Sequence, residues 1–185
     1  MKMENNRDRY GALTVGIHWF MLLQLAAVYA CVELRGIFPK GSDAAQAMKS
    51  WHYMLGLSVF VVVLLRVVAR MMAPAPAIMP APPKWQQQLA TLLQAALYAM
   101  MFCLPLAGWL LLSARGTPIP FFGLELPALI AKDKPTADFI KQVHAAGATI
   151  GYFLIGGHAA AALFHHYFVR DNTLRRMLPG RANSG

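Results

Sequence analysis

Four long stretches without a single charged residue constrain this chain more than any other feature. They are mainly apolar, each lies between two charged side chains, and they cover residues 10–32, 50–65, 85–114 and 142–169. A helix needs about 20 mainly apolar residues to cross a bilayer core roughly 30 Å thick. The second stretch has 16 residues, but the methylene stems of Arg66 and Arg70 can extend it toward one interface. We therefore expect an all-α membrane protein with spans at about 10–33, 47–70, 86–113 and 139–169, in one domain of residues 1–185.

Composition excludes other classes of protein. Charged residues make up 14% of the chain and hydrophobic residues 57%, whereas soluble domains carry about 25% charged residues. Two cysteines without a Cys-x-x-Cys-His motif cannot attach a haem covalently. The net charge is +9, but the basic residues fall between apolar stretches and not on one folded face, so we expect no nucleic-acid partner.

The distribution of lysine and arginine predicts the orientation. The N-terminus, the connection between the second and third spans, and the C-terminus together carry ten such residues. The opposite side carries the other seven, which are Arg35, Lys40, Lys49, Arg115, Lys132, Lys134 and Lys141. Because basic loops stay in the cytoplasm, we expect both termini there.

All six histidines lie inside the expected spans: His18, His52, His144, His158, His165 and His166. Ionisable residues at membrane depth are costly and are functional candidates by default. Alternatively, each could be a polar side chain that is hydrogen-bonded to a neighbouring helix. Six histidines on three helices favour the functional interpretation.

Four of these histidines are expected to form two pairs. His144 and His158 are 14 residues apart, which places them about 40° apart around one helix and about 21 Å apart along it. His52 and His144 each lie three residues inside a lysine of the non-cytoplasmic side, so they should meet at one level. His18 and His158 lie at matched depth near the cytoplasmic end.

Two cross-helix histidine pairs suit two bis-histidine haems, because a haem iron takes one axial ligand from each side. Glycines beside the ligands would leave room for the macrocycle, although they could equally serve close helix packing. Zinc is the rival metal, but no cysteine or carboxylate accompanies the pairs. We therefore expect His18, His52, His144 and His158 to be metal ligands.

Three further residues are candidates for cofactor binding. Arg66 and Arg70 follow His52 by 14 and 18 residues, so they share its helix face and could bind haem propionates. Anchoring at the cytoplasmic interface explains them equally well, and the two roles are compatible. His165 lies about 20° from His158 and could reach a substrate or a propionate. His166 points about 80° away and has no assigned role.

Several motifs carry a family resemblance. They are Ile17-His18-Trp19, Glu33-Leu34-Arg35-Gly36-Ile37-Phe38-Pro39, Arg115-Gly116-Thr117-Pro118, the stretch from Gly157 to Phe168, and Asp171-Asn172-Thr173-Leu174. With the four spans and four histidines, these motifs resemble the bacterial cytochrome b561 family of di-haem membrane cytochromes, and within it the superoxide oxidases.

This resemblance implies a four-helix bundle with two haems b in the bacterial inner membrane. It also implies an oxidoreductase that takes electrons from superoxide on the periplasmic side and passes them through the haems to ubiquinone. The ligand pairs carry over as His52 with His144 and His18 with His158, and His165 falls where the family contacts the quinone. We expect no obligate protein partner. The alternative is a haem b electron-transfer subunit of a larger hydrogenase or dehydrogenase complex.

The basic residues of the non-cytoplasmic side fit this activity. Superoxide is a small anion, and basic side chains around a haem edge would raise its association rate. The candidates for this role are Arg35, Lys49, Arg115 and Lys141. Reduction of the quinone consumes protons, so His165 could act as a proton relay, because imidazole titrates near neutrality.

Overall fold

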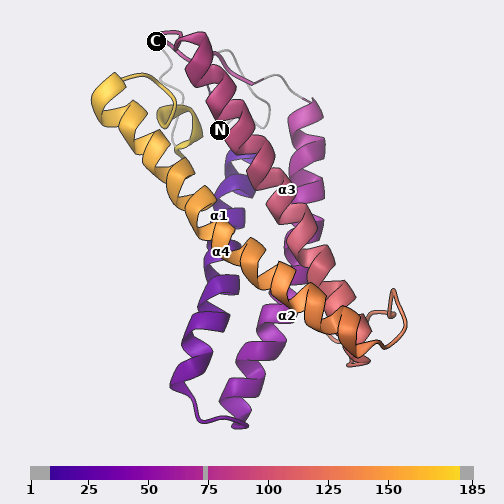
Figure 1. The fold of residues 1–185 in the computed structure, drawn as a ribbon. Coiled ribbons are helices and arrows are strands. Elements are labelled where there is room, and N and C mark those ends of the chain that lie inside the picture. Colours follow the sequence, from indigo (N-terminus) through magenta and orange to yellow (C-terminus); the bar gives the residue numbers. More distant parts are fainter. Residues whose placement is uncertain (1–8, 73–74, 180–185) are drawn as a thin grey trace. The chain divides into compact units, whose positions relative to one another are not determined.

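The computed structural model describes residues 9–72 and 75–179. Four long helices dominate it: α1 (Ala12–Glu33), α2 (Asp43–Met72), α3 (Lys84–Arg115) and α4 (Lys134–Phe164), drawn in Figure 1. Each is long and apolar enough to cross a membrane. The expectation of an all-α membrane protein with four spanning helices is therefore confirmed.

Short elements complete the described chain. A 3₁₀ helix, η1 (Leu34–Ile37), follows α1, a π-helix, η2 (His165–Val169), continues α4, and a second 3₁₀ helix, η3 (Arg175–Met177), comes near the C-terminus. Between α3 and α4, strands β1 (Pro120–Phe121) and β2 (Leu124–Glu125) pair antiparallel. This hairpin was not predicted from the sequence.

Polar side chains fix the starts of two helices. The hydroxyl of Ser42 accepts a hydrogen bond from the backbone of Ala45 at the start of α2. The Asp133 carboxylate accepts one from the backbone of Thr136, 2.9 Å away, at the start of α4. Such caps satisfy backbone donors that have no partner within the first helical turn.

Each of the four long helices carries large apolar side chains that face outward. Phe20, Leu23, Leu92 and Phe153 are each more than half exposed in the isolated chain. In a bilayer these side chains contact lipid, and the helices satisfy their backbone polar groups internally. The described fold therefore suits a hydrocarbon environment.

The chain divides into two compact units. The first contains the described residues within 1–20, 64–99 and 151–185, and the second contains residues 21–63 and 100–150. The second unit has a small core of Leu57, Leu112 and Ile119. The connection after α3 is bonded onto it, since Trp109 donates to the Pro127 carbonyl at 2.9 Å.

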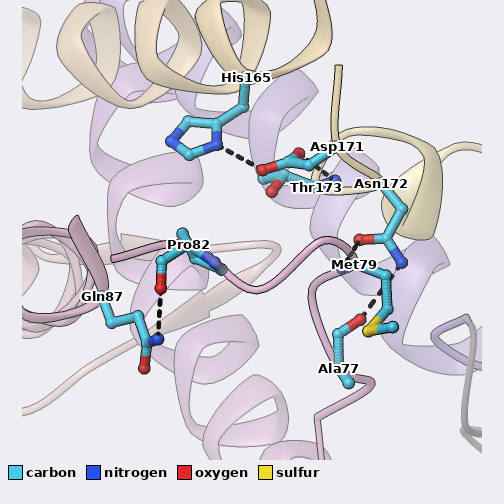
Figure 2. A network of polar contacts seen from close by, with 8 residues as sticks. All are labelled: Ala77, Met79, Pro82, Gln87, His165, Asp171, Asn172 and Thr173. Atoms are coloured by element: carbon cyan, nitrogen blue, oxygen red, sulfur yellow. Dashed lines mark hydrogen bonds and ion pairs between the residues drawn. The ribbon is translucent and has the colours of Figure 1, made fainter. Parts of the chain in front are cut away.

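In the first unit, the segment after α4 is hydrogen-bonded to the connection between α2 and α3. Asn172 accepts at its side-chain oxygen from the backbone of Met79 and donates its amide to the Ala77 carbonyl, as Figure 2 shows. The buried Arg176 donates to the Pro76 carbonyl and lies over the Tyr10 ring. We call residues 170–177 the C-terminal strap. It is held by bonds to two other parts of its own unit.

Candidate cofactor sites

The first histidine pair lies in the second unit. His52 of α2 and His144 of α4 have ring centroids 6.3 Å apart and ring planes at 82°. The Nδ1 atom of His52 lies 3.1 Å from the Val28 carbonyl of α1. A proton on Nδ1 donated to that carbonyl leaves the Nε2 lone pair for a metal. The backbone of α1 thus orients a ring that α2 carries.

The glycines near the ligands serve two purposes. A Cβ on Gly147 would lie 2.6 Å from Cδ2 of Leu104, so that side chain packs closely on the glycine and would have to move. By contrast, a Cβ on Gly56, Gly156 or Gly157 would meet nothing within 4 Å. The glycines therefore include examples of both interpretations. Gly147 is closely packed, whereas Gly56, Gly156 and Gly157 leave free space.

The second histidine pair lies in the first unit. His18 of α1 and His158 of α4 have ring centroids 6.2 Å apart and ring planes at 70°. Arg66 of α2 interacts electrostatically with both rings. Its Nε donates to the Tyr98 hydroxyl at 3.2 Å. Its Nη1 is buried and has no hydrogen-bond partner among the described residues.

The geometry gives less support to the expectation that Arg70 binds a haem propionate. Its Nη1 donates to the side-chain oxygen of Gln94 at 3.2 Å, and the arginine is exposed. The structure therefore separates the two arginines: Arg66 has a buried donor without a partner, whereas Arg70 is bonded to a neighbouring helix at the surface.

Both pairs fit a b-type haem. A metal–nitrogen bond is about 2 Å long, and the centre of an imidazole ring lies about 1.2 Å beyond the ligating nitrogen. Two imidazoles that bind one metal from opposite sides therefore have centroids about 6 Å apart. The unpartnered Nη1 of Arg66 suits a propionate oxygen. Structural zinc takes four ligands, and within residues 9–72 and 75–179 no three His, Cys, Asp or Glu side chains gather at one point. The geometry suits a cofactor held by two protein ligands.

The four basic residues expected to attract superoxide have different surroundings. Arg35 interacts electrostatically with His52, and the Lys49 ammonium lies 5.8 Å from the Tyr53 ring centroid. Tyr53 in turn contacts His52, with centroids 6.2 Å apart. Arg35 and Lys49 therefore belong to the surroundings of the His52–His144 pair.

Arg115 and Lys141 have an acidic neighbour. Both interact electrostatically with Asp138, which also pairs with Lys134 at 2.6 Å. The Asp138 carboxylate offsets part of their charge, so these two basic residues present less net positive charge than the sequence count indicates.

His165 has a partner that the sequence analysis missed. Its Nδ1 lies 2.6 Å from Oδ2 of Asp171, and the backbone of Thr173 donates to Oδ1 at 2.8 Å (Figure 2). Burial of the Asp171 carboxyl opposes its ionisation, but the hydrogen bonds from His165 and Thr173 outweigh this and lower its pKa below the ordinary value. Asp171 follows His165 by six residues, a spacing that matches no helical period, so the sequence did not predict this contact.

The direction expected for His166 assumed a regular α-helix. The sequence estimate used 100° per residue, but α4 ends at Phe164 and a π-helix begins at His165. The His166 ring contacts that of Tyr167, and its buried Nδ1 has no hydrogen-bond partner in the part of the chain that is described. No role for His166 follows from these contacts.

Comparison with known proteins identifies the family. The sequence profile described as prokaryotic cytochrome b561 matches residues 9–180. Cytochrome b561 homolog 1 of Escherichia coli (strain K12) is 40% identical over 174 residues, covering 94% of this chain and 99% of that protein. The probable superoxide oxidase CybB of Yersinia pestis is 36% identical over 171 residues, covering 92% and 96%.

A more distant relative aligns over the full length. Cytochrome b561 homolog 2 of Escherichia coli (strain K12) is 28% identical over 185 residues, covering 100% of this chain and 98% of that protein. The four spanning helices fit a multi-pass protein of the bacterial inner membrane. The chain belongs to the prokaryotic cytochrome b561 family, and is thus a membrane electron-transfer protein that binds b-type haem.

Proposed function

We propose that this chain is a superoxide:ubiquinone oxidoreductase with two haems b, held by His52 with His144 and by His18 with His158. The observation that carries the proposal is the pair of matched histidine spacings, 6.3 Å and 6.2 Å, each within one unit of the fold. Electrons enter at the His52–His144 pair and leave from the His18–His158 pair. Two superoxide ions and one ubiquinone, with two protons, give two oxygen molecules and one ubiquinol.

The donor end carries the residues suited to an anionic substrate. When bound, haem supplies a one-electron carrier whose potential depends on its ligands and their surroundings. Val28 orients one ligand ring, and Arg35 and Lys49 raise the local concentration of a small anion. Outer-sphere oxidation of superoxide forms no bond to the protein, so attraction and access are all that the side chains need to provide. The relative named as a probable superoxide oxidase supports this substrate.

The acceptor end carries the residues suited to a quinone. Arg66 offers a buried guanidinium nitrogen to a haem propionate, and His165 is the residue that we assign to the quinone. The excess of lysine and arginine on this side supports cytoplasmic termini. We propose that residues 1–185 act as one membrane domain without an obligate protein partner.

Rapid mixing tests the proposal directly. Oxidised, purified protein is mixed with superoxide while haem absorbance is followed, and a short-chain ubiquinone is then added. We expect fast haem reduction, then reoxidation by the quinone, with two haems per chain. Slow haem reduction by superoxide would overturn the proposal and favour an electron-transfer subunit that needs a protein donor.

A further inference from the structure

The chain leaves α4 in a way that returns it to His165. The regular helix ends at Phe164, and five residues follow in a π-helix, His165–Val169. Arg170 then adopts a left-handed conformation, with φ of 60°, and the backbone of Asp171 donates to the His165 carbonyl at 3.3 Å. Wide helical turns and left-handed non-glycine residues are uncommon and recur at functional sites. Here they place the Asp171 side chain beside the His165 ring.

Asp171 is held rigidly in this place. The residue is 2% exposed, although aspartate is rarely buried without a partner. Thr173 donates to one carboxylate oxygen, which leaves the other for His165. Asn172 anchors the same turn to Met79 and Ala77 through three hydrogen bonds. The bonds to its two oxygens, from His165 and Thr173, hold the carboxylate beside the ring.

The His165 ring has one nitrogen held and one available. Nδ1 faces Asp171, and the other ring nitrogen points away from it, as Figure 2 shows. In the described part of the chain, no hydrogen bond engages that second nitrogen, Nε2, and it is not among the fully buried polar atoms. A carboxylate that accepts a hydrogen bond from Nδ1–H fixes which ring nitrogen faces a ligand.

We propose that Asp171 is the positioning residue through which His165 delivers a proton to the reduced quinone, an inference that rests on the proposed function. The Nε2–H bond of the His165 imidazolium breaks and an O–H bond forms on one quinone oxygen. The quinone receives two electrons from two superoxide ions, and its second proton comes from solvent water. Solvent water returns the proton to Nε2. Asp171 stays ionised throughout and keeps Nδ1–H in its hydrogen bond.

The electrostatics of the pair agree with this assignment. The hydrogen bonds from His165 and Thr173 hold the pKa of Asp171 below its ordinary value, despite the burial of the carboxyl. An ionised Asp171 supplies the negative charge that an imidazolium partner requires. A purely structural strap would not need this charge, because the neutral amide of Asn172 already bonds the strap to the connection between α2 and α3.

Four variants test the inference: Asp171→Asn, His165→Gln, the double variant, and Asn172→Ala as the matched control. Asp171→Asn preserves shape but removes the charge, whereas Asn172→Ala removes strap bonds and leaves the His165–Asp171 contact. Each protein is reduced with one dithionite per two haems, which supplies one electron per haem, and its reoxidation by a short-chain ubiquinone is followed. This readout does not depend on superoxide as the donor.

We expect Asp171→Asn to lower the maximal rate of reoxidation about tenfold, with less than a twofold change in the half-saturating quinone concentration. The solvent isotope effect should rise, because proton delivery becomes rate-limiting. In the His165→Gln background, Asp171→Asn should have no further effect, since the two residues act as one unit. Asn172→Ala should retain most of the rate.

Other outcomes would overturn the inference. An unchanged rate in Asp171→Asn, equal losses in Asp171→Asn and Asn172→Ala, or additive losses in the double variant would each show that Asp171 only supports the strap. Haem content and the Soret band, measured first, identify a variant that fails to fold, and His165→Gln then tests the pair alone. If the unmodified protein reduces no quinone, the proposed function fails before the inference is reached.

Discussion

The two histidine pairs have similar spacings but different surroundings. His52 is oriented by a backbone carbonyl, and Arg35 interacts with it electrostatically. The surroundings of His18 and His158 include Arg66, with a buried unpartnered donor, and their unit also contains the His165–Asp171 contact. Removing an electron from superoxide moves no proton, whereas reducing a quinone consumes protons. Under the proposed function, titratable groups lie in the unit where protons are consumed, and fixed positive charge lies near the pair where electrons would enter.

Loss of a ligand is expected to have the largest effect. His52→Ala or His144→Ala should abolish one haem and retain the other, because each pair lies within its own unit. Haem extraction should give one haem per chain in place of two, and superoxide should no longer reduce the protein. His166→Ala is the control and should keep both haems. Two haems in His52→Ala would disprove the pairing.

Substitution of Arg66 tests the surroundings of the His18–His158 pair. A positive charge near a haem favours the reduced form, so Arg66→Leu should lower the potential of the haem at the His18–His158 pair. We expect a shift of about 60 mV, which corresponds to a tenfold change in a one-electron equilibrium. Redox titration in the visible spectrum measures it. Arg70→Leu is the matched control with a smaller expected shift, since Arg70 is exposed and bonded to Gln94; equal shifts would contradict the distinction.

Charge reversal near the His52–His144 pair should have a smaller effect than loss of a ligand, and this effect should depend on salt. Arg35→Glu should lower the superoxide rate about threefold at low ionic strength and less at high ionic strength. Arg115→Glu should have a smaller effect, because Asp138 already offsets part of the Arg115 charge. Stopped-flow rates at several salt concentrations provide the measurement. A loss of rate that does not vary with salt would argue against attraction.

The smallest expected effect concerns the cap of α4. Hydrogen bonds from Thr136 lower the pKa of the exposed Asp133 carboxyl. Because the carboxylate is favoured in the folded state, its contribution to stability is present at neutral pH and lost as pH falls through the lowered pKa. Asp133→Ala should therefore lower the unfolding temperature slightly at pH 7 but not at pH 2. Thermal circular dichroism at both values tests this, and an equal loss at both would exclude a charged cap.

Much of this organisation could be predicted from spacing. The uncharged stretches indicated four spans, and counting residues from the flanking lysines paired His52 with His144. Such inferences are possible because a membrane fixes helix length and depth, so position along the chain becomes position across the bilayer. The matched depths of His18 and His158 follow from the same constraint.

The features that could not be predicted from the sequence depend on backbone geometry or on contacts between residues distant in sequence. Val28 orients His52 through its carbonyl, which every residue type possesses. The β1–β2 hairpin turns on positive φ angles at Phe122 and Gly123, and phenylalanine is unusual in that conformation. The approach of Asp171 to His165 depends on a change from regular to π-helical turns, which no hydrophobic period reveals.

The π-helix has a consequence for how this part of the chain can vary. Its five residues set how far the backbone rotates before Arg170 reverses direction, so the number of residues between His165 and Asp171 matters more than their identity. Deleting one of residues 166–169 would carry the carboxylate around the helix axis and away from the imidazole, whereas conservative replacements there would leave the register intact. Between His165 and Asp171, insertions and deletions should therefore be tolerated less well than substitutions.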